Sequence, residues 1–205
     1  MMQLRNHIAM LLIAVALVAC GTDTSTTPTD TLATITKSDL RPDTVTRWLY
    51  YSFADDAVVA PEQIGVRQWD IKLPLLTVNS RTIDIMLNSG TVGNGSTTGC
   101  VVSSRWENVT RVLPAWNFRT DDTATVNRVV PNCVLCPQAM FTYTGPPSHA
   151  IMPSPDQVLV LRLADGSYVK MQITSVYQGA VTEPTATTPI GFYTMRYAKG
   201  LPKPN

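Results

Sequence analysis

Two runs of alternating, largely β-branched and apolar residues flank an Asp-Gly pair near the C-terminal end of the chain. The first run is Val158 to Leu163 (VLVLRL), the second is Ser167 to Ile173 (SYVKMQI), and Asp165-Gly166 lies between them. Asp-Gly between two such runs is a strong hairpin signal, because the type I′ turn that it favours needs positive φ at both central residues. The sequence therefore predicts an antiparallel hairpin here, and a fold built from paired strands.

The other apolar segments are also short and have the composition of strands. They are rich in Val, Ile and aromatic residues, and helical periodicity is almost absent. These segments are 48–53 (WLYYSF), 66–73 (VRQWDIKL), 81–87 (RTIDIML) and 191–198 (GFYTMRYA). In the third, Ile83, Ile85 and Leu87 fall on one face. The 15 prolines lie between the apolar runs, as is typical of loops between strands. We therefore expect an all-β, mainly antiparallel single domain with long ligand-type loops and little helix.

The N-terminus has the pattern of an export signal. Arg5 precedes an uncharged apolar run of 12 residues, Ile8 to Ala19. This is too short to span a bilayer, which takes roughly 20 residues, and it is typical of the h-region of a signal peptide. The run ends in Leu-Val-Ala-Cys, which resembles a bacterial lipobox with Cys20 as the lipidated residue. We expect residues 1–19 to be a signal peptide, and palmitate-type acyl chains on Cys20 to hold the protein at a membrane.

Residues 20–44 have the composition of a tether. They are rich in Thr and Asp and contain few large apolar side chains, so their burial would not offset the entropy lost on ordering them. We expect a flexible tether here and a folded domain at residues 45–205. Gly21, and not an aspartate that would retain a lipoprotein at an inner membrane, follows Cys20. The expected location is therefore the outer membrane or the cell surface.

Charge and histidine content exclude two classes of function. The 16 basic and 15 acidic residues are balanced, and no basic patch is interleaved with aromatic residues, so nucleic acid is not an expected partner. The chain has two histidines, and only His149 would remain after removal of the signal peptide. A hydrolase would need His149 as its base, but the chain has no G-x-S-x-G motif, and adjacent Asp121 and Asp122 suit a solvated turn. We do not expect an enzyme.

Three cysteines, Cys100, Cys133 and Cys136, remain besides Cys20. Outside the cell either Cys133 with Cys136, or Cys100 with one of them, is expected to form a disulfide, which leaves one free thiol. The Cys-Val-Leu-Cys motif is also compatible with a redox site, but prolines flank it in a segment without helical period. Together with His149 the three thiols form a Cys₃His zinc set by composition, without the spacing of a known finger.

Four sequence motifs resemble those of a known family. They are WLYYSF (48–53), QWDIKL (68–73), LNSGTVGNGSTTG (87–99) and VLVLRLADGSYVKMQI (158–173). In this order they resemble the HmuY-like family of bacterial surface lipoproteins, which includes haem-capturing proteins, and the last two motifs are the most specific. The resemblance spans about Val45 to Tyr197. It implies non-covalent binding of haem b, a role in iron acquisition and an outer-membrane haem receptor as partner.

The resemblance also suggests which residues would hold the iron. In haem-binding members two loops supply the axial ligands, as a His pair or a Met pair. One loop corresponds to residues 142–156, which contain His149 and Met152, and the other lies between Asp121 and Met140. Imidazole nitrogen and thioether sulfur both ligate haem iron, so His149 with Met140, or Met140 with Met152, are the expected pairs. No metal other than haem iron is expected.

A second interpretation stays open. The position at which haem-binding members can carry histidine falls near Thr144 or Gly145, and residues 121–140 contain no histidine. His149 is then an ordinary loop residue, and Met140 fills the core as methionine commonly does. The chain would be an envelope lipoprotein of the same fold with a structural or adhesion role and no haem.

Overall fold

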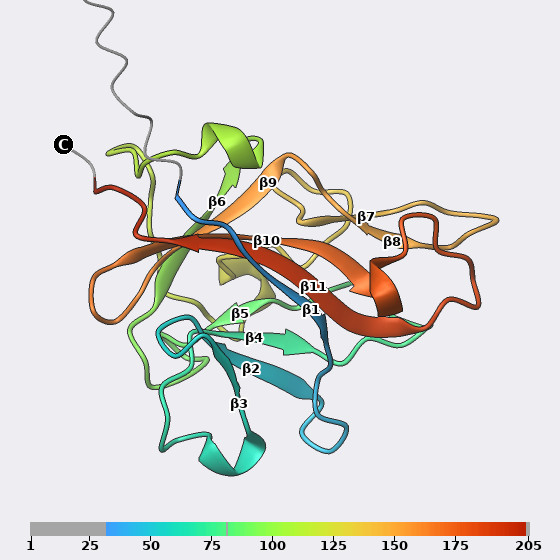
Figure 1. Ribbon diagram of the computed structural model, residues 1–205, viewed down its shortest axis with the longest axis horizontal. Helices are drawn as coiled ribbons and strands as arrows, with labels where there is room; N and C mark the ends of the chain where they lie inside the picture. Colours follow the sequence, from blue (N-terminus) through green and yellow to red (C-terminus); the bar gives the residue numbers. More distant parts are fainter. Residues whose placement is uncertain (1–31, 81, 204–205) are drawn as a thin grey trace, which may run out of the picture. The chain divides into compact units, whose positions relative to one another are not determined.

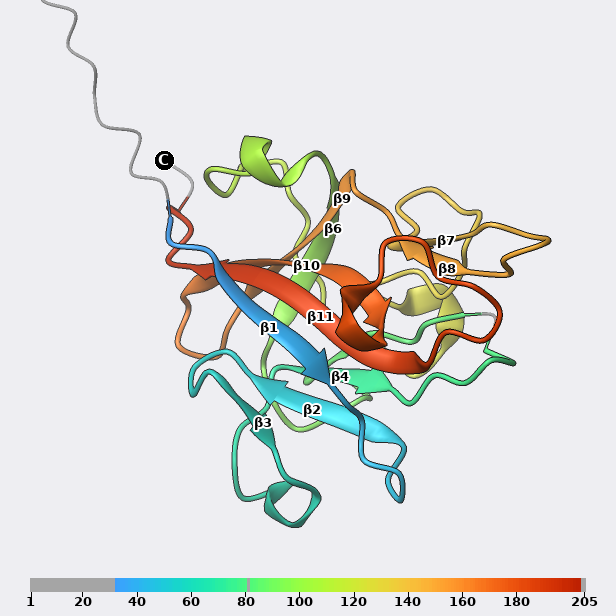
Figure 2. The ribbon, with the colours of Figure 1, turned by 45° about the vertical axis from the view of Figure 1, so that its right-hand side comes forward.

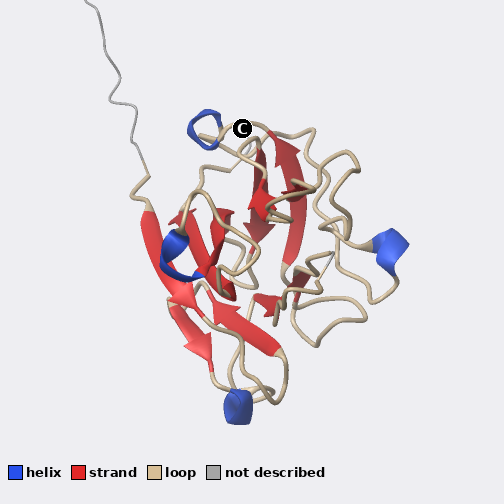
Figure 3. Ribbon diagram, turned by 90° about the vertical axis from the view of Figure 1, so that its right-hand side faces the viewer, coloured by secondary structure: helices blue, strands red, loops and turns tan. Residues whose placement is uncertain are grey.

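The computed structural model describes residues 32–80 and 82–203. These residues form the strands β1 (Ile35–Leu40), β2 (Trp48–Ser52), β3 (Ala57–Val59), β4 (Ile71–Pro74), β5 (Met86–Leu87), β6 (Thr98–Ser103), β7 (Phe141–Tyr143), β8 (Ile151–Pro153), β9 (Gln157–Arg162), β10 (Tyr168–Tyr177) and β11 (Ile190–Lys199). The helical elements of the same residues are 3-10 turns in the loops around the sheets, namely η1 (Pro61–Gln63), η2 (Trp106–Asn108), η3 (Thr125–Asn127) and η4 (Gln178–Ala180) (Figure 3). The predicted all-β class is confirmed.

The strands form two main sheets and one small one (Figure 1). The larger sheet has the order β1-β11-β10-β9-β6, the second has the order β3-β2-β4-β5, and β7 pairs with β8 alone. Every pairing between these strands is antiparallel, as predicted.

The predicted hairpin is present as β9 and β10, with Leu161 opposite Val169. The predicted type I′ turn is wrong, because only Gly166 in the loop has a positive φ, at 79°. The Gly166 N–H donates to the Leu163 carbonyl at 2.9 Å, and the Leu163 N–H donates to the Ser167 carbonyl at 2.9 Å. This is the three-residue loop in which one glycine takes the left-handed conformation. The Asp165 carboxylate accepts the Ser167 N–H at 2.8 Å and so stabilises the turn. The backbone of Asp165 itself does not have a positive φ.

The main core contains side chains from both larger sheets. In β10 every second residue, Val169, Met171 and Ile173, belongs to this core, while Lys170 and Gln172 face the opposite side of the sheet. Other members come from β2, β4 and β11, as in Leu49, Tyr51, Ile71, Leu73, Tyr193, Met195 and Tyr197. The predicted inward residues Ile83, Ile85 and Leu87 are also buried in it, although only the last of them lies in a strand.

The predicted strand at residues 66–73 is shorter in the structure. Strand β4 begins at Ile71, and the alternation does not extend back to Val66. Trp69 and Asp70 are consecutive and both buried, which a strand with one solvated face does not allow. The preceding residues instead form a turn, in which the Val66 and Arg67 N–H groups both donate to the Gln63 carbonyl.

Strand β1 lies inside residues 20–44, which the sequence assigned to a tether. It pairs with β11, with Ile35 opposite Tyr197 and Lys37 opposite Met195. The Lys37 ammonium contacts Asp56 Oδ1 at 3.1 Å, and the Tyr51 hydroxyl donates to the same oxygen at 2.7 Å. Because backbone pairing, more than apolar burial, orders β1, its polar composition did not reveal it. The folded part therefore begins earlier than residue 45.

The predicted signal peptide, the Cys20 lipidation site and most of the tether lie outside the described residues. Within residues 32–80 and 82–203, no helix has the length and apolar character needed to cross a membrane.

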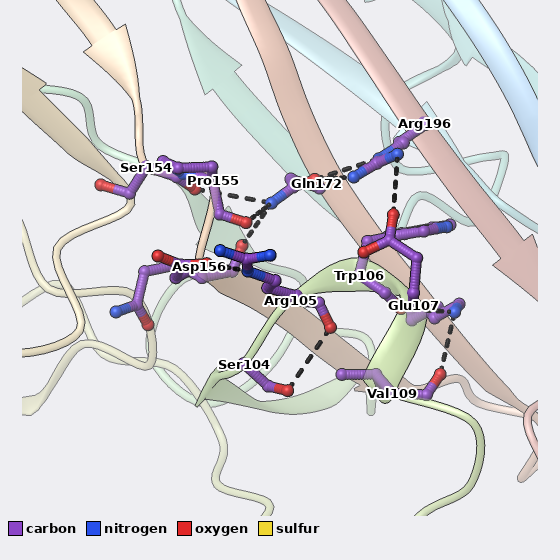
Figure 4. A network of polar contacts seen from close by, with 12 residues as sticks. Ser104, Arg105, Trp106, Glu107, Val109, Ser154, Pro155, Asp156, Gln172 and Arg196 are labelled. Atoms are coloured by element: carbon purple, nitrogen blue, oxygen red, sulfur yellow. Dashed lines mark hydrogen bonds and ion pairs between the residues drawn. The ribbon is translucent and has the colours of Figure 1, made fainter.

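Polar and cation–π contacts join η2 to β10 and β11, and Figure 4 shows hydrogen bonds and ion pairs of this region. Lys170 Nζ donates to the Trp106 carbonyl at 2.9 Å and to the Val109 carbonyl at 2.8 Å, and lies 4.3 Å from the Trp106 ring centroid. The Arg196 guanidinium carbon lies 4.7 Å from the same centroid. Gln172 Oε1 accepts from Arg196 Nε at 3.0 Å and Nη2 at 2.7 Å. These contacts fix η2 against β10 and β11.

Candidate functional site

The loop between β7 and β8, residues 144–150, presents His149. Thr144 closes this loop, because its N–H donates to the Ala150 carbonyl at 2.9 Å and its Oγ1 accepts the Ala150 N–H at 2.9 Å. The His149 N–H donates to the Gly145 carbonyl at 2.8 Å. His149 has a φ of 51°, a left-handed conformation that non-glycine residues adopt infrequently. The loop is therefore a defined turn that holds His149 at its end.

His149 lines a cavity of about 330 Å³, which we call the His149 cavity. Its other described lining residues are Thr77, Val78, Asn79, Ser80, Ser148, Ile151, Tyr177, Thr185, Ala186, Thr188 and Ile190. The Tyr143 hydroxyl is hydrogen-bonded to His149 Nδ1, and Nε2 has no hydrogen-bond partner among the described residues. The cavity thus combines one imidazole nitrogen with apolar and hydroxyl side chains.

The two methionines proposed as ligands lie elsewhere. Met140 is 3% exposed and belongs to the main core. Met152 is half-buried in β8, opposite Thr142. Neighbouring residues of a strand point to opposite faces, so Met152 points away from the side on which Ile151 lines the His149 cavity. The structure does not bring His149, Met140 and Met152 to one cleft, and of the three only His149 lines this cavity.

The structure pairs Cys133 with Cys136, with 5.9 Å between their Cα atoms, and leaves Cys100 as a free thiol. Cys100 is half-buried in β6 and lines a second cavity of about 520 Å³ with Trp116 and Arg119. Burial raises the pKa of the Cys100 thiol to about 11, although the Arg119 charge acts in the opposite direction. No group of three or more His, Cys, Asp or Glu side chains with the proximity of a metal site occurs in the part of the chain that the structure describes.

We expect Cys100 to react slowly with iodoacetamide, because the thiolate is the reactive form. Its pKa is about 11 where an ordinary thiol has 9.0, so at about pH 8 it holds roughly a hundredfold less thiolate. Mass spectrometry of timed samples measures the rate, and the same chain in urea serves as the control. Equal rates in the folded and unfolded chains would contradict the assigned burial.

The glycine-rich segment 88–99 wraps around the Asn88 side chain. Asn88 Nδ2 donates to the Trp69 carbonyl at 2.8 Å, and Oδ1 accepts the Gly95 N–H at 2.9 Å. A Cβ on Gly93 would lie 2.2 Å from Asn88 Oδ1. The backbone of this segment therefore closely approaches a side chain of the protein itself, that of Asn88.

Gly93→Ala is therefore expected to lower the free energy of unfolding by about 2 kcal/mol, as overpacking commonly does. The exposed Ser96→Ala, three residues later in the same loop, should change it by less than about 0.5 kcal/mol. Urea unfolding of both variants measures the difference. Equal free energies of unfolding for the two variants would show that the loop accommodates the added methyl group without loss of stability.

Asp121 was expected in a solvated turn, and this is wrong. The residue is 2% exposed. Oδ2 accepts the Leu87 N–H at 2.7 Å, and Oδ1 accepts the Val129 N–H and the Asp122 N–H, each at 3.0 Å. Asp121 is thus a structural carboxylate that joins β5 to the segment after η3, and the Asp121-Asp122 pair is not an acid/base pair.

Tyr143 is the residue of the His149 cavity region that the sequence did not reveal. It stands six positions before His149, on the far side of the Gly-Pro-Pro turn. The alternating Phe-Thr-Tyr before this turn was the available signal, because it places Tyr143 at a strand end opposite the residues that follow His149.

Comparison with solved structures shows likeness over most of the chain. An apo HmuY analogue of Tannerella forsythia has a TM-score of 0.49 at 16% identity, covering 83% of this chain and 99% of that one. A protein of Bacteroides fragilis described as a lipoprotein gives 0.46 and 15%, covering 80% and 89%. A Bacteroides vulgatus protein described as HmuY-like and haem-binding gives 0.45 and 16%, covering 81% and 90%.

Sequence comparison identifies the family. No curated protein sequence matches the chain. The model of the family described as HmuY protein matches residues 44–188, well over half of the chain. This range includes all four sequence motifs, the loop with His149 and both of the larger sheets apart from β1 and β11. The chain belongs to the HmuY family.

Proposed function

We propose that the protein is a lipid-anchored protein of the bacterial outer surface that binds haem non-covalently in the His149 cavity and so supports iron acquisition. The observation that carries this proposal is an exposed imidazole that a closed loop holds in the lining of a cavity, with one ring nitrogen free of partners among the described residues. Membership of a haemophore family supports a binding role over an enzymatic one.

The His149 cavity offers one imidazole and several apolar side chains to part of a haem. His149 Nε2 would hold the iron, and imidazole is an ordinary axial ligand. Ile151, Ile190 and Ala186 supply apolar wall for the macrocycle. The volume of about 330 Å³ is at the lower end of the range for small-molecule sites, roughly 300–1,000 Å³. The described residues therefore support ligation by one imidazole, with much of the haem edge outside the cavity.

The position of the cavity suits transfer of a ligand to a receptor. In two views the loop between β7 and β8 lies at one end of the five-stranded sheet, and the chain enters β1 at the other end (Figures 1 and 2). The described part of the chain thus begins at the end far from the loop. The proposed partner is an outer-membrane haem receptor that contacts the loop end.

We expect a saturable, red-shifted Soret band when haemin is titrated into residues 21–205. His149→Ala should weaken binding at least about tenfold, because it removes the one ligand in the cavity, and tenfold corresponds to about 1.4 kcal/mol. Met152→Leu keeps apolar volume outside the cavity and is the matched control, with unchanged affinity. Loss of binding in the Met152 variant, with His149→Ala unaffected, would move the site away from this cavity.

One observation favours a second candidate, an envelope lipoprotein of this fold without haem. Thr144, near the position where haem-binding members can carry histidine, is committed to closing the loop through Ala150 and Ser148. No second His, Met or Cys is among the described residues that line the cavity. A linear haemin response equal to that of an unrelated protein would establish this alternative.

A further inference from the structure

Tyr143 and His149 form a pair across the ends of one loop. Tyr143 is the last residue of β7, opposite Ile151 in β8. Its hydroxyl is hydrogen-bonded to His149 Nδ1, and the two rings lie 5.9 Å apart between centroids at an interplanar angle of 37°. The ring of His149 is therefore held from the side of Nδ1 by a residue on a paired strand.

The loop between the two residues is itself fixed. Thr144 Oγ1 is hydrogen-bonded to Ser148 Oγ at 2.7 Å, in addition to its contact with the Ala150 N–H. Tyr177 stabilises the chain just after His149, because its hydroxyl accepts the Ile151 N–H at 2.9 Å. The backbone on both sides of His149 is thus hydrogen-bonded, and the remaining freedom is rotation of the imidazole, which Tyr143 restricts.

The hydrogen bond between Tyr143 and His149 Nδ1 affects which ring nitrogen of His149 carries the proton. A neutral imidazole carries its proton on one nitrogen and accepts with the other. Histidines that bind metals almost always donate the second ring N–H to an oxygen, and this fixes both tautomer and ring orientation. A Tyr143 oxygen that accepts from Nδ1–H leaves the lone pair of Nε2 free for a metal.

We propose that Tyr143 is a positioning residue that holds His149 in the Nδ1–H tautomer with Nε2 available to the cavity. The inference deepens the proposed function and rests on it for its biological meaning, since haem iron is the metal concerned. Tyr143 is not among the residues that line the His149 cavity. It acts through the His149 ring.

Nitrogen-15 NMR of the metal-free chain, residues 21–205, tests the assignment directly. Long-range spectra distinguish the two ring nitrogens of His149, the one histidine within residues 21–205. We expect the wild type to carry its proton on Nδ1, and Tyr143→Phe, which keeps the ring but removes the oxygen, to show a mixture of tautomers. Tyr168→Phe is the matched control, because Tyr168 packs against Phe118 in the second, smaller core.

Haemin titration of the same three proteins supplies a second readout. Tyr143→Phe should bind about tenfold more weakly than wild type, as is usual for loss of a residue that orients a ligand, and Tyr168→Phe should bind equally. Wild-type protonation on Nε2, or a Tyr143→Phe spectrum identical to that of wild type, would overturn the proposal. The nitrogen shifts decide the role of Tyr143, and haemin binding by the wild type separately decides the proposed function.

Discussion

Asp121→Ala is expected to lower the free energy of unfolding by roughly 4 kcal/mol. The Asp121 carboxylate is buried and accepts three backbone N–H groups, from Leu87, Asp122 and Val129. Hydrogen bonds to a charged group contribute more than neutral ones, and a buried donor left without a partner costs about 1–3 kcal/mol. At least the Leu87 and Val129 donors would lose their acceptor inside the protein.

The neighbouring residue is the matched control. Asp122 is half-exposed and accepts from Thr91, Ala124 and Asn127 at the surface, where water can replace it, so Asp122→Ala should cost about 1 kcal/mol. Urea unfolding followed by far-ultraviolet circular dichroism measures both. Should Asp121→Ala fail to fold, Asp121→Asn keeps one acceptor and gives an intermediate value. Equal costs at the two positions would show that Asp121 does not organise the core.

Trp106→Ala is expected to cost roughly 3–5 kcal/mol, the range for removal of a buried tryptophan. Trp106 is 6% exposed and packs in the second core with Val109, Val158 and Leu201. Lys170 and Arg196 also lose the ring that their charges contact. Each such cation–π contact contributes about 0.5–2 kcal/mol, more when desolvated.

Two further variants separate packing from charge. Trp106→Leu retains apolar volume without the aromatic face, so the difference from Trp106→Ala reports packing. Trp48→Ala removes a half-exposed tryptophan that contacts Lys72 at 4.7 Å on the other sheet, and it should cost about 1–2 kcal/mol. Urea unfolding measures all three. A Trp106→Ala cost no larger than that of Trp48→Ala would mean that η2 is only loosely held.

The parts of the fold that depend on local pattern were predictable. Asp165-Gly166 located the β9–β10 hairpin, and the alternation of Ile83, Ile85 and Leu87 identified buried positions outside a regular strand. Strand β1 was missed because its stability comes from pairing with β11, about 155 residues later, as in the contact of Asp39 with Thr194. The composition of residues 35–40 alone does not indicate that they pair with a strand so far along the chain.

In the candidate site, too, the residues that local sequence identifies differ from those that depend on tertiary contacts. His149 could be found by elimination, because the chain offers one histidine beyond residue 7. For Tyr143 the sequence offered only a place at a strand end, because its contact with His149 depends on the geometry of the loop. Asp121 was misjudged for a related reason, and the sequence left two roles open for Met140. Whether a methionine lies in a core or a cleft, and whether a carboxylate meets water or backbone N–H groups 34 residues away, depends on tertiary contacts.

The way in which β1 joins the sheet determines how the domain carries mechanical load. β1 pairs antiparallel with β11 and lies at the sheet edge, and the loop with His149 lies toward the other end of the same sheet (Figures 1 and 2). A pull on the chain before Ile35, opposed by a partner that grips the loop, acts along the axis of β1. The β1–β11 hydrogen bonds and the Lys37–Asp56 ion pair then resist together in shear and do not open one at a time. When the domain is held before β1 and force is applied at the opposite end, the β1–β11 pairing therefore resists separation of the first strand.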